Sequence, residues 1–81
     1  MKAESLHIQV TDEVMTHIDL TFCASLTEHL PRLLPSRIRA RLKRRAIDPA
    51  FVGSQAAANG FRPGELFSCA DGPRTLRAWL E

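Results

Sequence analysis

The densest group of chemically active side chains in the sequence is a run of cations between residues 36 and 47. This run contains six cations and no acid: Arg37, Arg39, Arg41, Lys43, Arg44 and Arg45. A planar guanidinium donates paired hydrogen bonds to phosphate or carboxylate oxygens and stays charged at every accessible pH. The run therefore indicates a surface that binds an anionic partner, and these six residues are its candidate binding residues.

The basic run stands out because the rest of the chain is acidic. Residues 1–31 carry one lysine and five acids, whereas residues 32–45 carry seven cations and no acid. Residues 46–81 carry three arginines and four acids, and the formal net charge of the whole chain is +2. The electric field near the basic run should therefore exceed what the net charge suggests.

Nucleophilic catalysis would require a cysteine beside a histidine base that a third group orients. The chain has five residues of these two types: Cys23, Cys69, His7, His17 and His29. None of them lies in a strand-turn-helix nucleophile motif, and reduced, mostly buried thiols are the more common use of isolated cysteines. We therefore expect a protein that is not an enzyme and has no small-molecule substrate.

A metal site would require several histidine, cysteine or acidic ligands that converge. His17 and Asp19 fall on one face of an expected strand and His7 falls on a neighbouring strand, so a site of two histidines and one carboxylate is conceivable. Solvated polar residues on an exposed hairpin explain the same pattern. The four glycines are scattered and form no phosphate-binding loop. We expect neither a metal nor a cofactor.

A helix should position the basic run. Ser36 is a natural N-cap, and the helix is expected to end near Asp48. At about 100° per residue, Ile38, Leu42 and Ala46 form an apolar stripe that would dock this helix on the domain. The cations then form two groups: an outward arc of Arg37, Arg41, Arg44 and Arg45, with Arg39 and Lys43 on the far side of the stripe.

Alternating apolar and polar residues predict four strands: Leu6–Val10, His17–Phe22, Glu65–Ala70 and Arg74–Leu80. A polar turn at Thr11–Glu13 would join the first pair. Asp71-Gly72 between the second pair favours a hairpin, whereas Pro73 favours a loop longer than two residues. Trp79 falls with Arg77 on the face away from the core, where it either packs over the sheet or is exposed.

Two further helices are expected between the hairpins. From residue 24 leucines recur at helical spacing, with Ser25 or Thr27 as the N-cap and an interruption at Pro31. Another helix should follow Asp48-Pro49, with Asp48 as its cap, and end at Asn59-Gly60, residue types that tolerate a left-handed backbone.

The order strand, strand, helices, strand, strand predicts one α+β domain over residues 1–81, in which two antiparallel hairpins form a sheet packed against two or three short helices. A chain of 81 residues buries a small core, so homodimer formation would add burial. No apolar run approaches about 18 residues, and no signal-peptide core follows the N-terminus. We therefore expect a cytoplasmic protein with no membrane partner.

The order of these segments resembles small bacterial SHOCT-like domains over residues 16–81. Five patterns carry the resemblance: Ile18-Asp19-Leu20-Thr21-Phe22 leading to Leu34-Pro35, Ile47-Asp48, Gly64-Glu65-Leu66, Asp71-Gly72 and Trp79-Leu80-Glu81. The resemblance implies the same α+β architecture. It assigns no catalytic residue and no function.

Three interpretations of the basic helix compete. Nucleic-acid backbone is one, because the outward arc has arginines for phosphate but no Asn, Gln or aromatic residue to read bases. An acidic protein surface or a second copy of the chain is another. Alternatively the helix is only a solvated face, partly neutralised by Asp12, Glu13 and Asp19. Membrane attachment has least support, because the apolar stripe lacks Trp and Phe.

Overall fold

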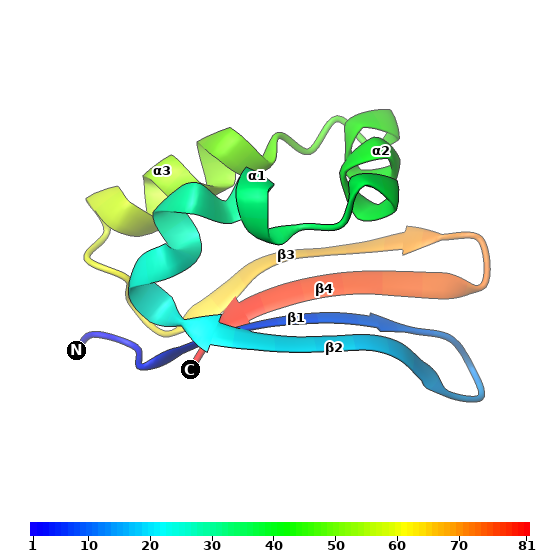
Figure 1. Ribbon diagram of the computed structural model, residues 1–81, viewed down its shortest axis with the longest axis horizontal. Helices are drawn as coiled ribbons and strands as arrows, with labels where there is room; N and C mark the ends of the chain where they lie inside the picture. Colours follow the sequence, from blue (N-terminus) through cyan, green and yellow to red (C-terminus); the bar gives the residue numbers. More distant parts are fainter.

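The computed structural model describes all 81 residues and contains one four-stranded antiparallel sheet in the order β2-β1-β4-β3. The strands are β1 Ser5–Thr11, β2 Thr16–Cys23, β3 Gly64–Asp71 and β4 Arg74–Leu80. Each hairpin pairs its own strands, and β1 pairs with β4 in the middle of the sheet (Figure 1). The predicted α+β arrangement of two hairpins is confirmed.

The helical segments lie together on one face of this sheet (Figure 1). They are the 3₁₀ helix η1 Ala24–His29 and the α-helices α1 Leu30–Leu33, α2 Ser36–Arg44 and α3 Pro49–Ala58. Pro31 lies in the first turn of α1. Proline lacks an amide donor and is tolerated only at this place in a helix, so the helical segment is divided into η1 and α1 just before it. The predicted interruption is confirmed, but the N-cap of η1 is Cys23, whereas Thr27 is buried and donates to the carbonyl of Ala24.

The core lies between the two central strands and the helices. Alternation along β1 and β4 directs three apolar side chains of each strand into it: Leu6, Ile8, Val10, Leu76, Ala78 and Leu80, none more than 3% exposed. Leu30, Leu34, Ile38 and Leu42 close the core from the helical side. On α3, a Cβ at Gly53 would lie 2.5 Å from the carbonyl oxygen of Thr27, so glycine permits the close approach of α3 to η1.

The helix that carries the basic run is shorter than predicted. Pro35 is its N-cap and Ser36 its first residue, with no side-chain cap. The helix ends at Arg44, because Ala46 adopts a left-handed conformation (φ 58°) and the chain turns back. The amides of Ala46 and Ile47 donate to the carbonyls of Lys43 and Leu42, which is the Schellman arrangement of hydrogen bonds. Ala46 is therefore exposed. The prediction that it extends the apolar stripe of Ile38 and Leu42 was wrong.

The capping signals of α3 are confirmed. The side chain of Asp48 accepts a hydrogen bond from the amide of Ala50 at 3.0 Å, and Pro49 is the first residue of the helix. At the other end Gly60 adopts φ 70°, and the amides of Gly60 and Phe61 donate to the carbonyls of Ala57 and Ala56. Both α2 and α3 thus end in the same motif, one with alanine and the other with glycine in the left-handed position.

The two hairpin turns differ from the sequence-based expectation. The β3–β4 loop contains only Gly72 and Pro73, because Asp71 pairs with Arg74. Gly72 has φ 62°, which suits the first central position of a type II′ turn, and the negative φ of the second position suits proline. The prediction of a longer loop was wrong, because a type II′ turn accommodates proline at its second central position.

The β1–β2 turn includes two apolar residues beyond the predicted polar segment. Asp12 organises it: its carboxylate accepts hydrogen bonds from the amides of Val14 and Met15 at 2.7 and 2.8 Å. Val14 and Met15 are consequently held at the tip, 89% and 57% exposed. Such a turn is stabilised by the short acceptor side chain of aspartate.

Candidate nucleic-acid interface on helix α2

Helix α2 docks on the sheet through two apolar side chains and carries cations on the rest of its circumference. Ile38 and Leu42 are buried, as predicted, with 3% and 0% exposure. The helix lies above the end of the sheet at which β3 turns into β4 (Figure 1). We define the basic surface as the six cations of this segment: Arg37, Arg39, Arg41, Lys43, Arg44 and Arg45.

Three of these cations converge on one carboxylate of the β3–β4 hairpin. An oxygen of Asp71 forms an ion pair with Nε of Arg41 at 3.3 Å, and the Asp71 oxygens lie 3.9 and 3.8 Å from the guanidinium groups of Arg44 and Arg45. Asp71 and Arg41 are the least exposed members, each with a side chain 24% exposed. The ion pairs therefore connect α2 to the β3–β4 turn, and part of the arc predicted to point outward faces the protein instead.

The three cations without an ion pair, together with Arg44, define the solvent side of α2. Arg37, Arg39 and Lys43 form no ion pair, and Arg44 keeps a side chain 70% exposed. At 100° per residue these four surround Ala40, which is itself exposed and lies away from Ile38 and Leu42. One carboxylate against six cations leaves the basic surface with five uncompensated positive charges.

The acids of the first hairpin do not contact α2. Asp12, Glu13 and Asp19 form no ion pair with the basic surface. The acid that partly neutralises this surface is Asp71. Asp12 instead binds Nε2 of His17. The hydrogen bond from His17, followed by the amides of Met15 and Val14, lowers the pKa of Asp12 from 3.8 to about 2.

The histidines occupy separate places in the fold. His7 stacks on Trp79 with ring centroids 5.0 Å apart and pairs with Glu81 at 3.1 Å. His17 binds Asp12 in the turn, and His29 pairs with Glu28. Along the sheet His7 lies opposite Thr21 and Asp19 opposite Gln9, so the structure does not bring His7, His17 and Asp19 together.

The cysteines are also apart from the histidines. Cys23 is exposed, contrary to the expectation of a mostly buried thiol, and Cys69 is half-buried; both are free. Burial raises the pKa of the Cys69 thiol, which disfavours the thiolate. Neither cysteine forms a hydrogen bond with a histidine.

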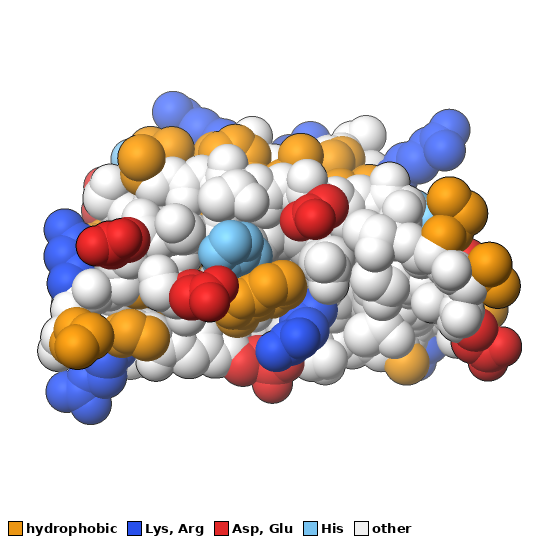
Figure 2. All heavy atoms as spheres, turned by 90° about the horizontal axis from the view of Figure 1, so that it is seen from below, with side chains coloured by type: hydrophobic (Ala, Val, Ile, Leu, Met, Phe, Trp, Pro, Cys, Tyr) orange, Lys and Arg blue, Asp and Glu red, His pale blue; other side chains and the backbone are white.

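The sheet face opposite the helices carries a mixture of charges rather than a basic patch (Figure 2). Trp79 is half-buried there, with the guanidinium of Arg77 4.6 Å from its ring centroid, so the packed alternative for this tryptophan holds. Arg77 also pairs with Glu65 at 3.2 Å. Because acids neutralise the cations on this face, the basic surface of α2 is the stronger candidate for an anionic partner.

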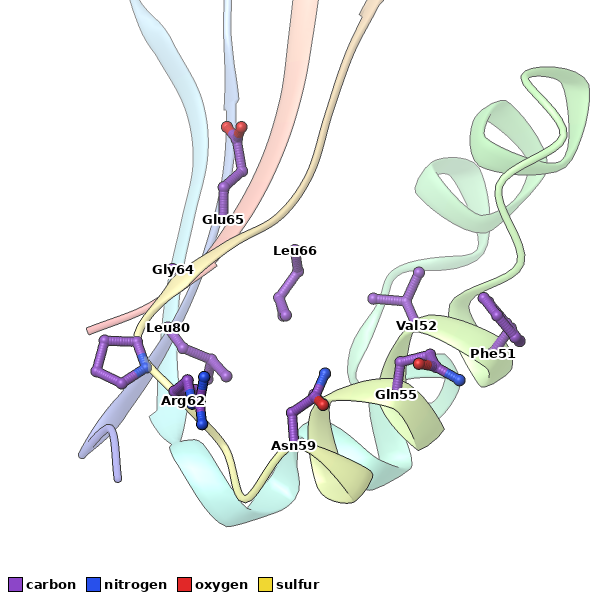
Figure 3. A pocket seen from close by; sticks show the side chains of 11 residues that line it. Phe51, Val52, Gln55, Asn59, Arg62, Gly64, Glu65, Leu66 and Leu80 are labelled. Atoms are coloured by element: carbon purple, nitrogen blue, oxygen red, sulfur yellow. The ribbon is translucent and has the colours of Figure 1, made fainter. Parts of the chain in front are cut away.

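A shallow hollow of about 420 Å³ lies between α3 and β3. Phe51, Val52 and Asn59 line it from the helix, while Leu66 and Leu80 line it from the sheet (Figure 3). Its charged lining residues are one arginine and one acid, Arg62 and Glu65. The hollow therefore lacks converging charges and is separate from the basic surface.

Comparison with protein-family models, with curated proteins and with solved structures finds no match for the chain. The resemblance to SHOCT-like domains therefore stays a prediction. Among the helices, none is long and apolar enough to cross a membrane.

Proposed function

We propose that the chain is a small binding module that contacts the backbone of nucleic acid through the basic surface of α2. The observation that carries this proposal is the imbalance between six cations and the single carboxylate of Asp71. Phosphates that replace solvent around Arg37, Arg39, Lys43 and Arg44 would release condensed counterions, which is the main driving force of backbone-directed binding. Because no Asn, Gln or aromatic side chain accompanies them, binding should be directed mainly to the backbone.

A comparison of two charge-matched variants tests the proposal. The triple variant Arg37→Ala, Arg39→Ala, Lys43→Ala removes three cations from the basic surface. The control Lys2→Ala, Arg62→Ala, Arg77→Ala removes three exposed cations elsewhere, so both proteins have the same net charge. We expect fluorescence anisotropy with a labelled generic DNA duplex to show a loss of at least tenfold in affinity for the first and little change for the second. Equal loss in both would contradict a localised interface.

An acidic protein surface is the second candidate, and the contacts of Asp71 favour it. The same guanidiniums already hold a carboxylate, with Arg41 at 3.3 Å, so carboxylates of a partner suit this surface. Copurification of a protein partner that survives nuclease treatment and is lost in the basic-surface variant would support this function. A complex that nuclease disperses would support nucleic acid instead.

A further inference from the structure

The two edges of the sheet differ in how they are protected. The β3 edge is interrupted by a bulge between Glu65 and Phe67. The β2 edge is eight residues long, contains neither proline nor lysine, and has a single charged acid, Asp19. Its own irregularity lies near the β1–β2 turn, between Ile18 and Thr16, so the register with β1 is unbroken from Cys23 to Ile18. Proteins usually protect edge strands with bulges, proline or charge, because a long regular edge pairs with other strands. Of the two edges, β2 is therefore the one suited to add a strand.

The backbone hydrogen bonds identify which groups of β2 are free. Ser5 and Glu81 exchange both of their backbone hydrogen bonds, so the odd-numbered residues of β1 bond to β4 and the even-numbered ones to β2. Leu20 is opposite Ile8 and therefore bonds to β1. Within the unbroken register, the odd-numbered residues of β2 direct their amides and carbonyls to the open edge: Asp19, Thr21 and Cys23.

The apolar face of β2 is incompletely covered. Ile18, Leu20 and Phe22 pack against the core but remain only half-buried, whereas the corresponding residues of β1 are buried. The difference arises because β2 has a neighbouring strand on one side only. A further strand at this edge would extend the sheet and bury the exposed halves of these three side chains.

We propose that β2 pairs in antiparallel orientation with β2 of a second copy of the chain, about a twofold axis at Leu20, to form a continuous eight-stranded sheet. In this register Leu20 faces Leu20 of the second copy, and Ile18 faces Phe22. The free amides and carbonyls of Asp19 and Thr21 then bond to each other across the axis, twice by symmetry. All apolar side chains stay on the helical face.

Other registers are less favourable. A register centred on Asp19 places two like charges directly opposite each other, which destabilises a strand pair. A shift by a single position pairs the apolar face of one copy with the polar face of the other. A register centred on Thr21 keeps the faces matched but places Ile18 opposite Ala24, which lies outside β2. The axis at Leu20 therefore combines matched faces, no like-charge pair and an apolar partner for each of Ile18, Leu20 and Phe22.

The molar mass in solution, measured by sedimentation equilibrium, tests the dimer. Between about 10 μM and about 1 mM we expect the mass to rise from 9.1 kDa towards twice that value. Thr21→Pro removes an amide that points to the open edge and leaves the bonds to β1 intact, so it should keep the monomer folded and abolish the rise. Ser68→Pro is the matched control, because the amide of Ser68 points to the open edge of β3; it should leave the dimer unchanged.

Charge at position 21 tests the register. Thr21→Lys places a cation opposite Asp19 of the second copy and should tighten the dimer about three- to tenfold, whereas Thr21→Asp should weaken it by a similar factor. Both substitutions are at an exposed position and should leave the monomer folded, so they still test the dimer if the proline variant fails to fold. A wild-type mass of 9.1 kDa throughout, or equal dimer affinities for the lysine and aspartate variants, would overturn the proposal.

Discussion

The guanidinium of Arg41 forms an ion pair with Asp71, with Nε 3.3 Å from the Oδ2 oxygen, and both side chains are only 24% exposed. This contact joins α2 to the β3–β4 turn. Because Arg44 and Arg45 also lie within 4 Å of the same carboxylate, Asp71 is an intramolecular competitor for any anion that approaches this side of α2.

Substitution Asp71→Asn should strengthen binding to duplex DNA about three- to tenfold at low salt, because it removes the competing charge and releases guanidiniums for phosphate. The domain should lose no more than about 1 kcal/mol of stability, since the ion pairs are partly solvated. Anisotropy titrations of both proteins would measure the change. Glu65→Gln, which removes the carboxylate beside Arg77 on the other sheet face, is the charge-matched control. Equal gains in the two variants would rule out a specific role for Asp71.

The C-terminal motifs of α2 and α3 both predict that glycine is more stable than alanine in the left-handed position. Ala46→Gly should stabilise the domain by about 0.5–1 kcal/mol, because an alanine with φ 58° is strained and glycine is not. Gly60→Ala should destabilise it by about 1 kcal/mol, because Gly60 has φ 70°. Urea unfolding would measure both free energies. A gain on Gly60→Ala, or a loss on Ala46→Gly, would contradict these helix ends.

The turn around Asp12 predicts a dependence of stability on acid pH. Its pKa of about 2 is below the ordinary value of 3.8, so the ionised carboxylate favours the folded state. This contribution is fully present above pH 4 and is lost as the pH falls from about 4 through about 2. Carboxyl NMR titration should show a midpoint near 2 that rises in His17→Ala and is unchanged in His29→Ala. A wild-type midpoint near 3.8 would show that the turn does not hold Asp12 as described.

Features of the fold with a local cause were predictable from the sequence. Alternation identified the four strands, and Asp48-Pro49 and Asn59-Gly60 marked the two ends of α3. The predicted ends of α2 were wrong because several residue types can adopt the conformation required there. Ala46 occupies a position at which glycine is the usual signal, and the N-cap of α2 is Pro35 rather than Ser36, which is the more typical capping residue.

The candidate site was predictable in composition but not in orientation. The sequence identified the six cations and the docking residues Ile38 and Leu42. It did not identify Asp71 as their partner, because that contact depends on where α2 crosses the sheet relative to a hairpin later in the chain. An Asp-Gly pair signals a turn, and periodicity does not encode which helix will lie above that turn.

The salt dependence of DNA binding tests the proposed interface most directly. If Arg37, Arg39, Lys43 and Arg44 each neutralise one phosphate, the logarithm of the association constant should fall with the logarithm of salt concentration with a slope of about −3.6. In the variant that lacks Arg37, Arg39 and Lys43 the slope should be about −0.9. A wild type that shows no binding at low salt, or a slope that is unchanged in this variant, would contradict the assignment of α2 as the nucleic-acid interface.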